Sequence, residues 1–315
     1  MQKMLPFVFN VRLKSYAFFS DYLGILEGNG IDTKPTLYNH FTTLIFGGRA
    51  DFLNYLEGFP TGRKIRKRLK RKFVYRLPKD ILTYVKTQID NNNYVILVLN
   101  AKTLSSVTFD RDWYHEWFIH GYDDSTERFS AVGHDVDKSC HAFELKQIDI
   151  RYADLKQSLP PKTKRTELVW MPQNAMTEPL NLRKIKRDIF LYAYNLLPLI
   201  FNAAIYPKYS MLLRLWYGNN EEPFDLRGFK LLTEHKALML QMMNDLVSNS
   251  QAAEQYKAIQ AKTNAMLMTA LKYNMTKKNK DRAIETICHI LKQLRQNEPR
   301  VLRMFYRELI QLKNE

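Results

Sequence analysis

The sequence predicts an α+β protein whose N-terminal half combines a helix with an antiparallel sheet and whose C-terminal half is all helical. Residues 94–150 alternate between β-branched or aromatic runs and short polar turns, a pattern typical of consecutive strands. Beyond about residue 177, apolar residues recur at helical spacing. A proline- and lysine-rich stretch at 160–165 separates the two patterns, so we expect domains at 1–160 and 178–315.

The first elements are short. Residues 5–13 predict a strand, and Ser15 precedes an apolar helical stretch over 16–26. That helix stops at Gly28-Asn29-Gly30, which is typical of a glycine C-cap. A second helix is expected over 36–46.

The remaining elements of the first domain follow from turn residues and hydrophobic pattern. Pro78-Lys79-Asp80 predicts the start of a helix that runs to about Asp90. Strands are expected at 73–77, 94–99, 116–122, 128–132 and 142–150, followed by a short helix at 152–158.

The second domain is predicted to consist of helices alone. We expect them near 181–197, 207–217, 224–248, 252–273, 280–295 and 299–312. Glu298-Pro299 predicts the start of the last helix, because proline is favoured at the first helical position.

Composition limits the possible classes. The net charge of +16 raises the question of a nucleic acid or an anionic membrane surface as partner. Two cysteines, Cys140 and Cys288, cannot form a disulfide framework and suit a reducing compartment, so a cytoplasmic location is expected. The most apolar window, 189–206, is interrupted by polar residues and proline, so no membrane span is expected.

Motifs for cofactors and metals are missing from the chain. It contains no GxGxxG and no GxxxxGK[ST] loop, so no nucleotide cofactor is expected. The segment HEWFIH, residues 115–120, reads HExxxH and not HExxH, and it lies in a predicted strand. No zinc site is therefore expected there.

One strand carries a histidine at a recognisable position. His115 lies six residues before the glycine of Gly121-Tyr122-Asp123-Asp124, at the head of the predicted strand 116–122. This arrangement resembles the histidine strand of papain-like enzymes, among them double-glycine peptidases, and more closely the butirosin biosynthesis H-type N-terminal family. Segments 147–159, 180–194 and 224–239 are similar to later parts of that family, in the same order.

The resemblance implies a papain-like fold and a role in specialised peptide or antibiotic biosynthesis. Papain-like catalysis uses a nucleophile at a helix N-terminus, an imidazole from a strand and a group that orients the imidazole. By resemblance, Ser15 stands in the place of the family's cysteine, or Ala17 does in another register, and His115 is the base. The orienting acid is expected near Gly133, with Asp135 or Asp123 as candidates.

Each of these residues also has an ordinary structural interpretation. Ser15 could cap the helix that follows it with its hydroxyl. His115 could be a polar residue at a strand entry, and His120 a core or rim histidine. A serine is far less ionised than a cysteine at neutral pH, so a displaced acid would be especially damaging to catalysis.

The densest charge feature is the basic run at 63–72. Its eight cations are Arg63, Lys64, Arg66, Lys67, Arg68, Lys70, Arg71 and Lys72. The run could be a solvated face, a docking surface for an acidic carrier protein or peptide, or a nucleic-acid site. It lacks interleaved aromatic residues, and no RNA-binding signature accompanies it.

Three functional hypotheses follow. The first is a papain-like enzyme of acyl transfer or amide cleavage on a carrier-bound or peptide substrate, with a degenerate nucleophile. The second is a non-catalytic relative that docks an acidic partner through its basic face. The third is a nucleic-acid-binding protein with a helical accessory domain.

Overall fold

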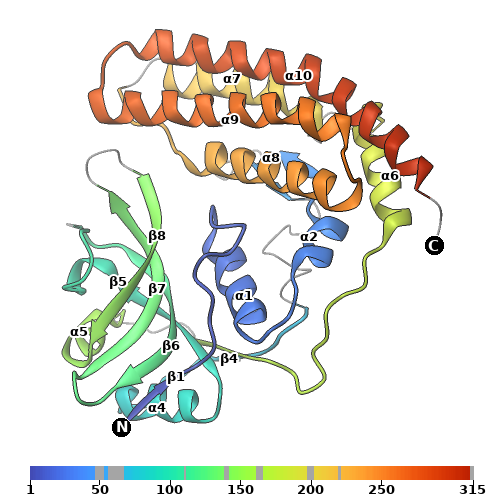
Figure 1. The fold of residues 1–315 in the computed structure, drawn as a ribbon. Helices are drawn as coiled ribbons and strands as arrows, with labels where there is room; N and C mark the ends of the chain where they lie inside the picture. The colour runs from blue at the N-terminus through green and yellow to red at the C-terminus, as the bar shows by residue number, and fades with distance from the viewer. Residues whose placement is uncertain are drawn as a thin grey trace. The chain divides into compact units, whose positions relative to one another are not determined.

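The predicted α+β class is confirmed. The structure is a computed structural model that describes residues 1–46, 53–55, 67–109, 111–137, 142–160, 166–196, 202–218 and 221–312. An antiparallel sheet occupies the N-terminal half, and the C-terminal half is mostly helical (Figure 1). Internal contacts divide the chain into two compact units.

The sheet unit contains residues 1–32, 65–138 and 143–176, and the helical unit contains 33–64, 139–142 and 177–315. Residues 33–64, which a boundary after residue 160 would assign to the sheet, therefore group with the helices.

The sheet unit is built on a sheet whose spatial strand order differs from the order of the strands in the chain. Its strands are β1 (Gln2–Met4), β4 (Lys70–Val74), β5 (Tyr94–Asn100), β6 (Tyr114–Asp123), β7 (Arg128–Asp137), β8 (Ala142–Arg151) and β9 (Thr166–Trp170). The order is β4-β9-β5-β6-β7-β8, and β1 pairs with the end of β6. The sequence pattern did not predict β9, which inserts between β4 and β5.

Helices cover both faces of this sheet (Figure 1). On one face lies α1 (Ala17–Gly28), whose Tyr22 hydroxyl is 3.2 Å from Glu167 of β9. On the other lie α4 (Ile81–Asp90) and α5 (Tyr152–Ser158), which contact β5 and each other.

Two predicted helix boundaries in this unit are confirmed. Gly30 after α1 has φ of +77°, and the Ile31 amide donates to the Leu26 carbonyl at 3.0 Å, as in a Schellman cap. Asp80 caps α4 by accepting from the Thr83 amide at 3.2 Å. The strand predicted over 5–13 is wrong, because the chain pairs with β6 earlier, at β1.

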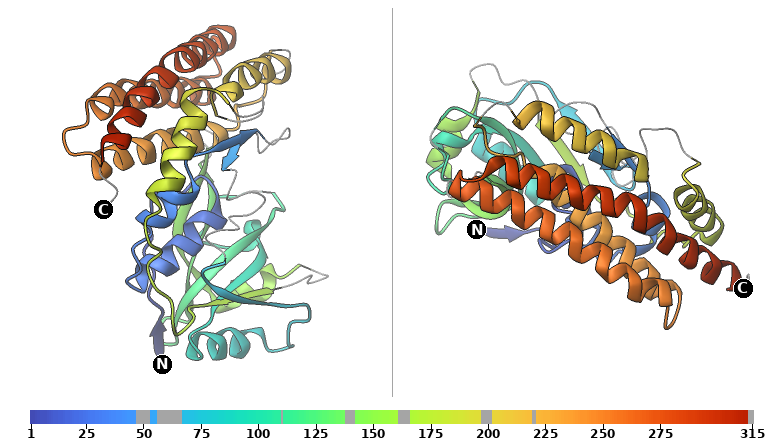
Figure 2. Two further views of the ribbon diagram at one scale, coloured as in Figure 1. Left: turned by 90° about the vertical axis from the view of Figure 1, so that its right-hand side faces the viewer. Right: turned by 90° about the horizontal axis from the view of Figure 1, so that it is seen from above.

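Within the described residues, the helical unit contains a small hairpin beside its helices. The helices are α2 (Lys34–His40), α6 (Leu182–Ala193), α7 (Ile205–Tyr217), α8 (Arg227–Leu246), α9 (Gln251–Thr276) and α10 (Lys280–Gln311). The hairpin is β2 (Leu44–Phe46) with β3 (Leu53–Tyr55), so the helix predicted over 36–46 ends early. Helices α9 and α10 run side by side (Figure 2). No helix in the described ranges is long and apolar enough to cross a bilayer.

The break predicted at Glu298-Pro299 is wrong, because α10 continues through the proline. Proline in a helix interior removes one backbone hydrogen bond and is disfavoured by about 3 kcal/mol. Here Glu298 and Pro299 are buried, as are Leu294 and Leu302 on neighbouring turns. Tertiary packing along this face therefore outweighs the local preference.

An ion pair lies in the interior of the helical unit. Lys236 Nζ of α8 is 2.7 Å from Glu298 Oε1 of α10, and both side chains are fully buried. The hydroxyls of Tyr192, Tyr206 and Tyr256 also donate to the Glu298 carboxylate. These tyrosines lie on α6, α7 and α9, so one carboxylate connects five helices.

The ammonium group of Lys236 is equally well satisfied. It donates to the Tyr192 hydroxyl and to His235 Nδ1, each at 3.0 Å, as well as to Glu298. His235 Nε2 in turn lies 3.1 Å from the Thr42 carbonyl. Burial, and next the Lys236 charge, hold the pKa of His235 well below its usual value, so the imidazole is neutral.

Removing one partner of this pair is predicted to destabilise the helical unit strongly. Lys236→Met leaves the Glu298 charge buried without its counter-ion, and we expect it to cost about 3–5 kcal/mol of unfolding free energy. Urea denaturation followed by far-ultraviolet circular dichroism, which reports helix content, measures the decrease in unfolding free energy.

The exposed pair Lys257–Glu254 provides the control. Glu254→Gln should change the unfolding free energy by less than about 0.5 kcal/mol. The double variant Lys236→Met/Glu298→Gln should recover part of the single-variant loss. A Lys236→Met cost as small as that of the control would contradict a stabilising role for the pair.

Candidate functional site

Ser15 does not occupy the predicted capping position. The N-cap of α1 is Tyr16, no side chain caps this helix, and Ser15 lies one residue further out. Its side chain is only 3% exposed. A hydroxyl buried to this degree is poorly placed to attack the carbonyl of a bound substrate.

His115 lies near the start of β6, partly exposed and surrounded by aromatic rings. Its ring centroid is 4.4 Å from Trp113 and 5.8 Å from His134. Its Nδ1 is 2.8 Å from the Glu116 carbonyl oxygen, so Nδ1 carries the hydrogen and donates it. A backbone carbonyl therefore orients the ring in the way that the predicted acid was expected to do.

Strand alternation relates His115 to α1. Glu116 adds to the electrostatic environment of Asp21 on α1, and the Phe118 ring contacts the Phe7 ring on the same face, with ring centroids 4.9 Å apart. Because successive side chains on a strand point to opposite faces, the His115 side chain lies on the face of the sheet away from α1.

The position expected for the orienting acid is closed by an indole ring. A Cβ at Gly133 would lie 2.3 Å from Trp117 Cε3, so no larger residue fits there. Asp135, two residues on, is 1% exposed and accepts from Thr108 Oγ1 and from Lys146 Nζ, each at 3.0 Å. Asp135 thus anchors the turn that contains Thr108 to β7 and β8.

The prediction that Asp123 could be the acid that orients His115 is wrong. The two residues lie near opposite ends of β6, about 26 Å apart at about 3.3 Å per residue. Asp123 instead accepts from the amide and hydroxyl of Ser125, at 2.8 and 2.6 Å, in the turn before β7. These hydrogen bonds lower the pKa of Asp123 below its usual value.

His120 lies in the core, as its ordinary interpretation predicted. It is buried and stacks on Phe7 at 5.0 Å and Phe118 at 6.0 Å, beside a bulge between β6 and β7. Burial lowers the pKa of His120 to about 4, so the ring is neutral at physiological pH.

A buried acid on α1 was not predicted from the sequence. Asp21 is 5% exposed, and burial, followed by the charge of Glu116, raises its pKa well above the usual value. The Ser20 hydroxyl, 3.3 Å away, opposes this shift. Glu167 of β9 contributes further repulsion while it pairs with Arg71 at 3.3 Å. The sequence feature that could have indicated this buried acid is its position as the single acid within the apolar run FFSDYLGIL.

The basic run is only partly within the described residues. Arg63, Lys64 and Arg66 lie outside them, whereas Lys67 and Arg68 precede β4 and the other three cations lie on it. β4 ends the strand order and, among the residues described, pairs with β9 alone. Lys70, Arg71 and Lys72 are exposed, and of these three only Arg71 has an ion pair with a described residue, Glu167.

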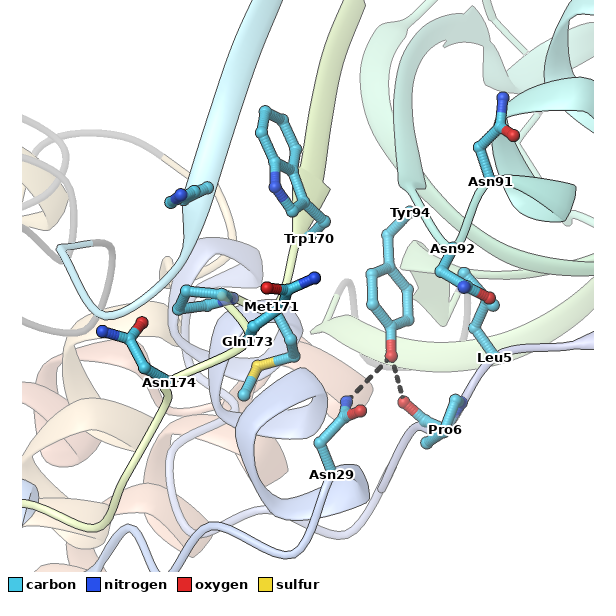
Figure 3. Close-up of a pocket in the computed structure, with 12 residues that line it drawn as sticks. Leu5, Pro6, Asn29, Asn91, Asn92, Tyr94, Trp170, Met171, Gln173 and Asn174 are labelled. Carbon is cyan, nitrogen blue, oxygen red and sulfur yellow. Dashed lines mark hydrogen bonds between the residues drawn. The ribbon is translucent and has the colours of Figure 1, made fainter.

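A polar pocket adjoins the start of β4 (Figure 3). Its volume is about 790 Å³, and Lys70 and Trp170, which pair across β4 and β9, form one side. Five amide side chains also line it: Asn29, Asn91, Asn92, Gln173 and Asn174. Tyr94 anchors the opposite wall, where its hydroxyl donates to the Pro6 carbonyl at 2.5 Å and accepts from Asn29 at 3.1 Å.

The described residues contain no group of three His, Cys, Asp or Glu side chains that could hold a metal ion. Comparisons with known proteins give no assignment: no family model matches the chain, and no curated protein matches it.

Replacing the buried acid is predicted to change the pH dependence of stability. Because the pKa of Asp21 is higher in the folded than in the unfolded state, its stabilising proton is fully bound below about pH 4 and lost as the pH rises through the folded value. Asp21→Asn cannot ionise, so we expect it to gain about 1 kcal/mol or more over wild type between pH 5 and pH 8. Urea unfolding at both pH values measures this gain.

Asp123→Asn is the matched control, because the pKa of Asp123 is lowered and the group is ionised in both states above pH 5, roughly one unit above its usual value. The control should leave the dependence of the unfolding free energy on pH unchanged. If the unfolding free energy of Asp21→Asn depended on pH as that of wild type does, Asp21 would not be a buried acid with a raised pKa.

Proposed function

We propose that this protein is a non-catalytic relative of the papain-like, butirosin H-type proteins and that it binds an extended acidic peptide along β4. The exposed, cation-bearing edge strand is the observation that carries this proposal. An edge strand presents unpaired backbone donors and acceptors, to which an extended peptide can add as a further strand.

Charge favours an acidic peptide. Lys70 and Lys72 alternate with Arg71 along β4, and neither lysine has an ion pair with a described residue. A peptide with acidic residues at every second position would place carboxylates beside both lysines. Lysine on an edge strand also discourages pairing between copies of the same chain.

The adjoining pocket gives the peptide a place to end. Because Lys70 is the first residue of β4 and also lines the pocket, a peptide paired with β4 leads directly into it. The amides of Asn91, Asn92 and Gln173 can donate to and accept from a peptide backbone or a polar side chain. Trp170 offers an aromatic surface.

Binding is preferred to catalysis because of the residues at the predicted catalytic positions. Ser15 is buried, and the Trp117 indole covers the position expected for the acid. Asp135 already binds Lys146 and Thr108. A serine nucleophile depends wholly on an aligned base, which this arrangement does not favour.

Charge reversal on β4 is predicted to weaken peptide binding. The probe is a fluorescein-labelled peptide of about eight residues, alternating glutamate and threonine, whose extended length covers β4. Lys70→Glu/Lys72→Glu should weaken binding at least about tenfold in fluorescence anisotropy. Lys79→Glu, an exposed change in the same unit but outside β4, should alter binding less than about twofold.

A backbone-modified peptide separates strand addition from charge attraction. The same peptide with N-methyl groups on alternate amides keeps its charge and loses one row of donors, so it should bind at least about tenfold more weakly. Equal binding of both peptides would rule out strand addition on β4.

Acyl transfer is a second candidate, favoured by one observation. His115 Nδ1 donates to a carbonyl, so in the neutral ring Nε2 would carry the lone pair that a general base requires. A fluorophosphonate probe that labels wild type but not Ser15→Ala or His115→Ala would support this candidate. Absence of labelling, together with unchanged peptide binding by both variants, would support the non-catalytic function.

A further inference from the structure

A second cationic surface lies in the helical unit, in a groove between α9 and α10. Four of its lining residues, Gln255, Ala258, Ile259 and Lys262, lie on successive turns of α9. The facing residues on α10 are Asn297, Arg300, Val301, Arg303, Met304 and Arg307. The volume of the groove is about 540 Å³, and Figure 2 shows the two helices side by side.

The groove carries positive charge and no carboxylate among its lining residues. Arg300 and Arg307 have no hydrogen bond or ion pair with any part of the chain that the structure describes, and both are exposed. The acids of α10 that lie nearby are used elsewhere. Glu298 is buried with Lys236, and Glu308 accepts from Ser250 Oγ at 2.6 Å at the start of α9.

The floor of the groove is apolar. Ile259 is 2% and Val301 6% exposed, and Met304 lies beside them, partly exposed. Methionine adapts its shape readily to different apolar partners. The lining from Asn297 to Arg307 extends about 15 Å along α10, at 1.5 Å per residue, which matches about three turns of another helix.

We infer that this groove binds an acidic amphipathic helix of a partner protein. The apolar side of such a helix would cover Ile259, Val301 and Met304, and its flanking carboxylates would meet Arg300 and Arg307. Nucleic acid fits the charge but not the floor, because single-stranded nucleic acid is bound by stacking on aromatic rings, and no lining residue is aromatic. A second copy of this chain, at net charge +16, would be repelled.

The test uses a labelled peptide of about 14 residues, or four helical turns, stapled as a helix with leucine on one face and glutamate beside it. Fluorescence anisotropy with the full chain should show saturable binding. Arg300→Glu/Arg307→Glu should weaken it at least about tenfold. Arg295→Glu, an exposed change on another face of α10, should alter it less than about twofold.

Two further measurements separate a helix site from general attraction to anions. Met304→Gln should weaken peptide binding by roughly threefold or more, because it removes apolar contact and leaves the charge intact. A scrambled peptide of the same composition should bind at least about tenfold more weakly.

Equal binding of the scrambled peptide would overturn the inference. So would an unchanged affinity in Arg300→Glu/Arg307→Glu. Displacement of the peptide by a single-stranded RNA of equal charge, with no effect of Met304→Gln on either ligand, would assign the groove to nucleic acid instead.

Discussion

The helical unit depends on one buried carboxylate that is paired and hydrogen bonded from several helices. Glu298 accepts from three tyrosine hydroxyls and the Lys236 ammonium, and its donors come from α6, α7, α8 and α9. A buried charge is tolerated only when it is paired and hydrogen bonded, so these helices must hold their donors in place together. The same requirement explains why α10 continues through Pro299, since a break there would move Glu298 away from its partners.

The elements that could be predicted from sequence are those fixed by interactions between residues close together in the chain. The Gly30 cap of α1 and the Asp80 cap of α4 are made by neighbouring residues, and both were predictable. β9 forms because Thr166–Trp170 pairs with Lys70–Val74, about a hundred residues away, and no local pattern specifies that pairing. The path of α10 through Pro299 likewise depends on donors from other helices.

The candidate site divides in the same way. The spacing of His115 from the glycine turn correctly placed it at the head of a strand. Its hydrogen bond to the Glu116 carbonyl depends on ring orientation, and the contact of Gly133 with Trp117 depends on strand register, so neither could be derived from spacing. The raised pKa of Asp21 needs both the burial of α1 and the acids on β6 and β9, which only the folded chain brings together.

The distribution of buried charge makes the surface more basic than the composition suggests. Among the described residues, five acids but only one cation are buried: Asp21, Asp135, Asp154, Asp188, Glu298 and Lys236. Some of these acids hold surface cations, as Asp135 holds Lys146, but Lys70 and Lys72 on β4 and Arg300 and Arg307 on α10 have no ion pair with a described residue. The whole surface therefore attracts anions at long range, an attraction that is screened within about 8 Å at physiological salt. For the acidic partners that we propose, selectivity would come from short-range features, because charge alone does not distinguish one acidic partner from another. These features are the edge of β4, which among the described residues pairs with β9 alone, and the apolar floor of the α9–α10 groove.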